Sequence, residues 1–342
     1  MKTINQSTQM QSSTIIMDRQ LILLFGMPRS GTTWIGKIFD SHPSVIYRHE
    51  PDSWKRMVAI PVISNSDEYE KYCRDITDYI EGLDTISLQP VVAKLPVFSK
   101  KTVGSIRYGF FRINVLLSML LSRLFSKVKL PVISLVTPGK VKLMSMAWKS
   151  IESLGRLGVI LKCNKRIKAI HIIRHPCGYI SSVLSGESGG KFVCNTATSE
   201  DYAFFDELLK SPISKKYGLS IEKLENMQAI ERLSWRWVLI NEHAMSNTES
   251  ERVFVLKYED LCKKPVDVTK KMFEFTGLEW NEQTEKFLSN STSKQSDAYY
   301  SVYKDPVKSS EKWKSKLESD EINAIRKIIS GTIPGQLYEK DF

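Results

Sequence analysis

Residues 21 to 34 read LILLFGMPRSGTTW: an apolar run, a loop bounded by two glycines, and a polar restart. The apolar run predicts a buried strand, and residues 32–39 continue as a helix. A loop between a strand and the start of a helix directs backbone N–H groups at one point beyond the carboxyl end of the strand. Because glycines let the backbone approach closely and the two threonines add hydroxyl donors, this segment predicts an anion site.

Similar apolar runs bounded by turn residues recur along the 342-residue chain. Helical patterns follow several of them, which predicts parallel strands joined by crossover helices. The fold class we expect is therefore α/β, with a parallel β-sheet flanked by helices. The further strands are expected at residues 44–47, 158–161, 169–173 and 253–256, and helices at residues 178–184, 222–244 and 266–276.

Residues 52–153 show little of this alternation and predict a mostly helical insertion over the sheet, on the acceptor side. Within it, residues 115–125 carry leucines at helical spacing. This spacing favours an amphipathic core or lid helix, and a helix on a membrane surface is left open. Residues 1–19 predict a disordered lead-in, and residues 20–342 a single domain.

The net charge of +11 is unevenly distributed. Residues 85–186 hold 17 lysines and arginines and one acidic residue, Glu152. Such a field can attract a polyanionic nucleotide, an anionic acceptor, an acidic lipid surface or nucleic acid, or it can be a solvated basic face. Charge alone does not choose among these partners.

The five cysteines are scattered, with no C-x-x-C pair. This pattern predicts free thiols in a reducing compartment and argues against a disulfide framework or a zinc site. The amino-terminal residues have no apolar run behind a basic start, so they do not resemble a signal peptide. We therefore expect a cytoplasmic protein.

The loop differs from the ATP- and GTP-binding pattern G-x-x-x-x-G-K-[ST] at one decisive position, where Thr32 replaces the lysine. A kinase needs that lysine to neutralise the β- and γ-phosphates. Here the cation is Arg29, which lies earlier in the loop and would be beside the anhydride of a shorter chain. A nucleotide kinase stays the alternative, and it would bind ATP with magnesium.

A second anion site is predicted where the strand at residues 169–173 ends in Arg174. The helix that follows carries Ser181 and Ser182. An arginine at the carboxyl end of a strand and a serine in the next helix can converge on one phosphate. The same residues could also form an ordinary turn.

The motif P-R-S-G-T-T-W followed by His42-Pro43 resembles the 5'-phosphosulfate loop of sulfotransferases that use 3'-phosphoadenosine 5'-phosphosulfate (PAPS). The resemblance implies a P-loop-like sulfotransferase fold, a 3'-phosphate site at Arg174 and Ser182, and a tyrosine near the adenine in Tyr258-Glu259-Asp260-Leu261. It implies that Trp34 stacks on the adenine, although on local grounds Trp34 could equally be a core residue. Lys308 is the candidate in the carboxyl-terminal segment, where the R-K-G triplet of the cytosolic branch is missing. The loop residues that would hold the phosphosulfate are Arg29, Ser30, Gly31, Thr32 and Thr33.

The acceptor must lose a proton to a base, and the candidates are His49 and Glu50. In the glycan- and tyrosine-modifying branches of the family, a glutamate at about this distance from the loop is the base. The resemblance therefore selects Glu50, with His49 as its rival and Arg29 as the group that stabilises the departing oxygen. Both candidates could instead cap a strand and pair with nearby arginines.

Together these features predict in-line transfer of a sulfuryl group from PAPS to a hydroxyl or amine, with PAP as product and no metal required. The acceptor is open among small molecules, glycans and lipids. We expect no nucleic-acid partner and leave peripheral membrane contact open.

Overall fold

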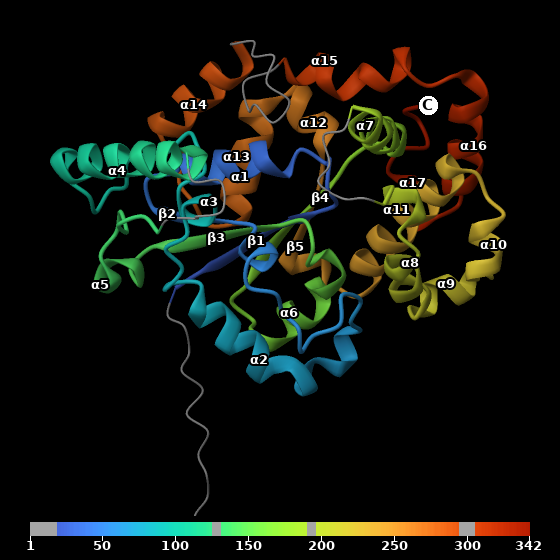
Figure 1. Cartoon of the computed structure of the whole chain (residues 1–342), viewed down its shortest axis with the longest axis horizontal. Helices are drawn as coiled ribbons and strands as arrows, with labels where there is room; N and C mark the ends of the chain where they lie inside the picture. The colour runs from blue at the N-terminus through green and yellow to red at the C-terminus, as the bar shows by residue number, and fades with distance from the viewer. Residues whose placement is uncertain (1–18, 125–130, 190–195, 294–304) are drawn as a thin grey trace, which may run out of the picture.

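A computed structural model describes residues 19–124, 131–189, 196–293 and 305–342 and has the expected α/β architecture (Figure 1). Within these residues a sheet of five strands, all of them parallel, has the order β2-β3-β1-β4-β5. Parallel strands end at one edge of a sheet, so the loops that follow them gather there. The strands are β1 (Leu21–Gly26), β2 (Val45–His49), β3 (Ser145–Ser150), β4 (Lys168–Ile173) and β5 (Val253–Lys257).

Strand β1 lies at the centre of the sheet and is buried along its whole length. Its alternate residues belong to different cores: Leu23 and Phe25 face one, and Ile22 and Leu24 the other. A strand covered on both faces needs apolar residues at every position, which explains the continuous apolar run. The first core lies against α2 (Tyr69–Gly82), α6 (Leu157–Cys163) and α11 (Ala229–Ser246), and the second against α1 (Thr32–Ser41), α13 (Pro265–Phe275) and α14 (Glu282–Ser293).

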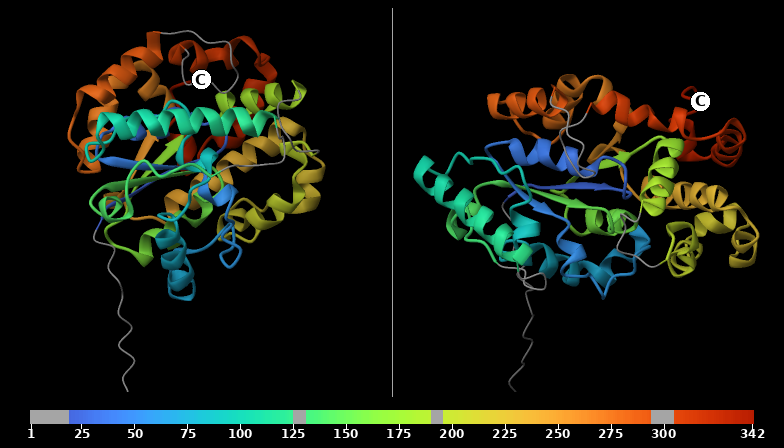
Figure 2. Two further views of the ribbon diagram at one scale, coloured as in Figure 1. Left: turned by 60° about the vertical axis from the view of Figure 1, so that its left-hand side comes forward. Right: turned by 45° about the horizontal axis from the view of Figure 1, so that its top comes forward.

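The remaining helices lie around the sheet and the two groups of helices that cover it (Figure 2). Helix α4 lies at the periphery, beside the β2 edge of the sheet (Figures 1 and 2). No helix of the described residues is long and apolar enough to cross a bilayer. The remaining helices are α3 (Gln89–Val92), α4 (Ser105–Leu124), α5 (Pro138–Val141), α7 (Pro176–Ser188), α8 (Tyr202–Leu209), α9 (Pro212–Lys216), α10 (Ile221–Glu225), α12 (Tyr258–Lys263), α15 (Pro306–Glu311), α16 (Ser319–Ile329) and α17 (Ile333–Gln336).

Two strand predictions differ from the structure. The strand expected at residues 158–161 is wrong, because this run forms helix α6. A short apolar run fits a buried helix as well as a buried strand. Strand β3, between β1 and β2, was missed because its sequence SMAWKS has few β-branched residues. The segment expected as a helical insertion therefore contains α2 to α5 and also a strand of the sheet.

At its amino-terminal boundary the described chain differs from the predicted lead-in. Arg19 is buried and its guanidinium pairs with the Asp84 carboxylate at 2.6 Å, so this residue belongs to the folded domain. The rest of the predicted lead-in lies outside the described residues. The long helix expected at residues 222–244 is divided, because α10 and α11 are separate helices.

The expectation that every cysteine is a free thiol is wrong for one pair. Cys73 of α2 and Cys163 of α6 form a disulfide that links these two helices. The pair is 90 residues apart in sequence, and a spacing of that kind carries no recognisable signal. Cys177 and Cys262 are free and buried, and Cys194 lies outside the described residues. The cytoplasmic localisation rested on free thiols and stays a prediction.

Candidate active site

The predicted loop is closed by Gly31 and the ring of Tyr258. Gly31 has φ 78°, in the left-handed region, and occupies the N-cap position of α1, where it offers no side-chain cap to the first-turn N–H groups. A Cβ at this position would lie 2.2 Å from Cε2 of Tyr258, the first residue of α12. The close approach requires glycine, and it brings together two residues that the sequence placed in one site although they are 227 positions apart.

The residues of the second predicted anion site contact those of the first. The Nε of Arg29 donates to the Ser182 hydroxyl at 3.0 Å, and Nη1 of Arg174 donates to the Arg29 carbonyl at 2.8 Å. Strands β1 and β4 are neighbours, so the loops that follow them meet at the carboxyl edge of the sheet. The expected convergence of Arg29, Arg174 and Ser182 is therefore present in the fold.

Arg174 has the surroundings of an anion-binding arginine. Its Nε is buried and has no hydrogen-bond partner among the described residues, and its Nη2 donates to the Ser309 carbonyl at 3.0 Å. A buried donor without a partner is costly, and an anionic ligand would relieve that cost. The backbone of Arg174 is held by α11, because the Trp237 indole N–H donates to its carbonyl at 3.0 Å. These residues fit a phosphate group.

The residues after Arg174 are braced by the carboxyl-terminal part of the chain. The His175 ring stacks on Trp313 with the ring centroids 4.6 Å apart. The Glu259 carboxylate accepts hydrogen bonds from the backbone N–H of His175 and from the Tyr338 hydroxyl. Burial lowers the pKa of His175 to about 3 and raises the pKa of Glu259. His175 is therefore a neutral packing residue that fixes the turn after β4.

Trp34 and Lys308, two of the residues predicted to contact the nucleotide, have contacts outside the group of Arg29, Arg174 and Ser182. Trp34 is buried, its indole N–H donates to the Ser291 hydroxyl at 3.1 Å, and its edge faces Tyr258. Its stacking on adenine stays a prediction. The Lys308 side chain is exposed, and its ammonium lies 3.7 Å from the Asp305 carboxylate. The contact from α15 to Arg174 is made instead by the Ser309 carbonyl. In the loop itself Ser30 and Thr32 are buried and Thr33 is half-buried.

Glu50 follows β2 and is joined to a lysine that the sequence did not reveal. The Lys149 ammonium, buried near the end of β3, forms an ion pair with Oε1 of Glu50. Positions 49 and 149 are direct partners in the β2–β3 register, so the sheet itself brings this pair together. Glu50 and Lys149 are 99 residues apart in sequence. Lys149 also lies in a strand that was not recognised, so nothing in the sequence indicated this ion pair.

The backbone singles out two of the three predicted catalytic residues. In the described part of the chain, the non-glycine residues with positive φ are Arg29, at 70°, and Glu50, at 47°. Such conformations are uncommon, cost free energy and cluster at functional sites. Here each of them aims a charged side chain from the loop that follows a strand.

His49, the rival candidate base, is buried among cationic side chains. Burial and the nearby lysines, Lys149 first among them, hold its pKa far below the usual range. Its Nδ1 is 2.8 Å from the Tyr47 hydroxyl, and its Nε2 is 3.9 Å from the Glu50 carboxylate, too far for a hydrogen bond. A base of very low pKa accepts protons weakly, which argues against His49 as the base.

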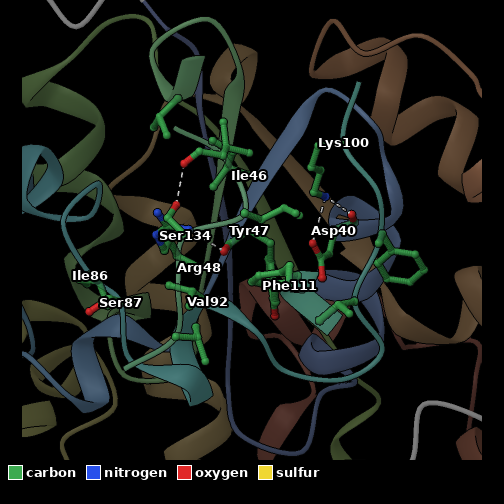
Figure 3. Close-up of a pocket in the computed structure, with 16 residues that line it drawn as sticks. Asp40, Ile46, Tyr47, Arg48, Ile86, Ser87, Val92, Lys100, Phe111 and Ser134 are labelled. Atoms are coloured by element: carbon green, nitrogen blue, oxygen red, sulfur yellow. Dashed lines mark hydrogen bonds and ion pairs between the residues drawn. The ribbon is translucent and has the colours of Figure 1, made fainter. Parts of the chain in front are cut away.

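A pocket lies between β2 and the insertion, with about 560 Å³ of empty space that includes open solvent (Figure 3). Its charged side chains are paired: Lys100 with Asp40 at 3.1 Å, and Arg48 with the Leu83 carbonyl at 2.8 Å. The rest of the lining is mostly apolar and includes Phe111 from the inner face of α4. The pocket therefore lies between β2 and α4.

The sequence model of the sulfotransferase family matches residues 22–282, which include the loop, both anion-site residues and Glu50. The chain belongs to the sulfotransferase family. It is a transferase with the P-loop-like sulfotransferase fold, as predicted.

Three individual sulfotransferases are similar to this chain at low sequence identity. Carbohydrate sulfotransferase 1 of Danio rerio is 22% identical over 338 residues, which cover 87% of this chain and 73% of that protein. Mouse sulfotransferase SULT7A1 complexed with PAP is 12% identical with a TM-score of 0.44, and the match covers 94% of this chain and 89% of that one. The sulfotransferase domain of the Synechococcus PCC 7002 olefin synthase is 14% identical with a TM-score of 0.41, over 90% and 94% of the two chains.

Proposed function

We propose that this sulfotransferase moves a sulfuryl group from PAPS to an acceptor hydroxyl or amine, with Glu50 as the base and PAP as the product. The observation that carries the proposal is the contact of Arg29 with both Ser182 and Arg174 at the carboxyl edge. Two joined anion sites suit a nucleotide with phosphate groups at both its 3' and 5' positions. One site alone would suit any nucleotide.

The order of the strands supports the division of labour. Glu50 follows β2, which is two strand positions, or about 10 Å, from β1 and its loop. Arg174 follows β4 on the opposite side of β1. The base, the phosphosulfate loop and the 3'-phosphate site are therefore arranged in this order along one edge, which leaves the β2 side for the acceptor.

PAPS supplies an activated sulfuryl group when it is bound. The N–H groups at the start of α1 and the Arg29 guanidinium hold the phosphosulfate and stabilise the negative charge that develops on the departing oxygen. Arg174 and Ser182 hold the 3'-phosphate, and Glu50 removes the acceptor proton. The ion pair with Lys149 directs the Glu50 side chain. We propose that these side chains make a metal unnecessary.

The acceptor we favour for the first test is a carbohydrate hydroxyl. The Danio rerio relative is named a carbohydrate sulfotransferase, and the family is shown over most of this chain. A lipid or small-molecule acceptor, or an amine, would require the same base and the same donor site. A screen of PAPS consumption over glycans, alcohols, phenols, lipids and amines identifies the class.

Donor binding tests the two joined sites. Titration calorimetry with Arg174→Ala should show PAP binding weakened about 10- to 100-fold, because a charge-assisted hydrogen bond is lost. AMP binding should be unchanged. Arg252→Ala is the matched control, because Arg252 is also half-buried and bonded to a carbonyl but lies before β5, at the other edge of the sheet. Equal losses for PAP and AMP, or magnesium-dependent ATP binding as tight as PAP binding, would contradict the proposal.

Transfer tests the base. Glu50→Gln keeps the side-chain shape and should bind PAP like the wild type while losing nearly all transfer, about 100-fold or more. His49→Gln should keep most of the activity, because His49 is neutral and engaged by Tyr47. If His49→Gln were inactive and Glu50→Gln active, the two assignments would be reversed.

A further inference from the structure

Helix α4 exposes a row of large apolar side chains to solvent. Six of them recur at intervals of three and four residues, which places them on one face of the helix. Each is more than half exposed: Ile106 79%, Phe110 69%, Ile113 56%, Leu117 52%, Leu120 54% and Leu124 68%. We name these six residues the outer stripe. Contiguous apolar surface of this kind marks an interaction site in soluble proteins.

The opposite face of α4 already holds the helix on the protein. Phe111 and Val115 are buried in a small core with Ala93 and Val132. Helix α4 is therefore apolar on two faces, and among the described residues its packing against the rest of the chain uses the inner face. The outer stripe is not needed to attach the helix.

Basic residues border the outer stripe. At 100° per residue, Arg107 and Arg112 lie on its two sides, and both are exposed. The Asn114 side chain accepts from the Ile133 N–H at 3.0 Å, which places Ile133, 69% exposed, beside the helix. Lys140 and Lys142, both exposed, come shortly before Leu143, which is 75% exposed. The insertion thus exposes both apolar and cationic side chains.

The charge of the region selects the partner. The chain has no acidic residue between Asp84 and Glu152. A second copy that met the first through this same face would bring like charges together, which opposes association. An anionic bilayer offers apolar interior for the stripe and negative headgroups for the arginines and lysines at its borders.

We propose that the outer stripe of α4, with its basic borders, docks this protein on an anionic membrane surface. The helix lies in the plane of the interface, with the stripe in the acyl region and the arginines at the headgroups. This docking does not depend on the proposed reaction, because no residue of the donor or base sites takes part. It would place the β2 side of the sheet, where the acceptor is expected, beside the lipid.

Vesicle co-sedimentation of the full chain tests the docking. The wild type should bind phosphatidylcholine vesicles that contain phosphatidylserine, bind pure phosphatidylcholine much less, and be released by salt. Leu117→Glu/Leu120→Glu should lower the partition coefficient about tenfold or more. Val58→Glu is the control, because Val58 is an apolar residue that is 88% exposed and lies outside α4. This variant should bind like the wild type. Thermal melts establish that all variants are folded.

Three outcomes would overturn the proposal. In the first, the wild type fails to bind the phosphatidylserine vesicles. In the second, Leu117→Glu/Leu120→Glu binds as well as Val58→Glu. In the third, light scattering would find a wild-type dimer that does not bind vesicles and that Leu117→Glu/Leu120→Glu dissociates. The stripe would then be an interface between two copies of the chain.

Discussion

Replacing Gly31 by alanine tests how tightly the nucleotide loop is built. The backbone at this position has φ 78°, and the added Cβ would lie 2.2 Å and 2.4 Å from two carbons of the Tyr258 ring. Contacts between a Cβ and another carbon are normally longer than about 3.4 Å. Either the ring or the loop must therefore move by about 1 Å.

The cost has two parts that can be separated. Holding a residue with a Cβ in the left-handed region costs about 1–2 kcal/mol. Displacing a buried ring from a packed core costs about 1–3 kcal/mol. Gly31→Ala should therefore lower the free energy of unfolding by about 2–5 kcal/mol, a large part of the stability of an ordinary domain.

Urea denaturation followed by tryptophan fluorescence measures this cost, and two further variants divide it. Gly277→Ala should show the dihedral part alone, because Gly277 has φ 67° and nothing lies within 4 Å of its added Cβ. In a Tyr258→Ala background, Gly31→Ala should lose the clash, with a coupling energy of about 1–3 kcal/mol. If Gly31→Ala cost the same with and without the Tyr258 ring, the described contact would be wrong.

Three further predictions concern stability and the donor site. Cys73→Ser should lower the free energy of unfolding by at most about 4–5 kcal/mol, as expected for a 90-residue loop, and dithiothreitol should destabilise the wild type but not this variant in urea denaturation. Burial lowers the pKa of His171 from 6.5 to about 4, so the unfolded chain binds more protons in this range and urea midpoints should fall as the pH drops from 6.5 to 4; His171→Gln should flatten that slope. Trp237→Phe should weaken PAP binding about fivefold in calorimetry through loss of the bond to the Arg174 carbonyl, and unchanged binding would exclude this positioning role.

The approach of Arg29 to Arg174 and Ser182 could be predicted because the signals for it are local. The loop from Gly26 to Trp34 carries its glycines, its hydroxyls and its cation within nine residues, next to a strand of unmistakable pattern. Arg174 likewise follows a clear strand. Parallel strands end at one edge, so the loops of neighbouring strands can meet, and the resemblance to sulfotransferases implied that Arg29 and Arg174 bind opposite ends of one nucleotide.

The features that were missed depend on contacts between distant segments. Strand β3 is stabilised by two neighbours in the sheet rather than by its own residues, so SMAWKS gives no local signal. Lys149 was invisible as the partner of Glu50 for the same reason. The Cys73–Cys163 pair depends on how α2 packs on α6, and residues 158–161 are helical because their tertiary setting outweighs their β propensity.

The order of the strands also has a consequence for biosynthesis. Strand β1 emerges early from the ribosome, but Leu21 pairs with Met146 in β3, and Ile22 pairs with Lys168 in β4. At about 5–20 residues per second, the most apolar strand waits on the order of 6–25 seconds for its first neighbour in the sheet. Through that interval it has no sheet partner on either side, which invites aggregation. A nascent chain arrested before residue 146 should therefore be a chaperone client, and one extended past residue 173 much less so.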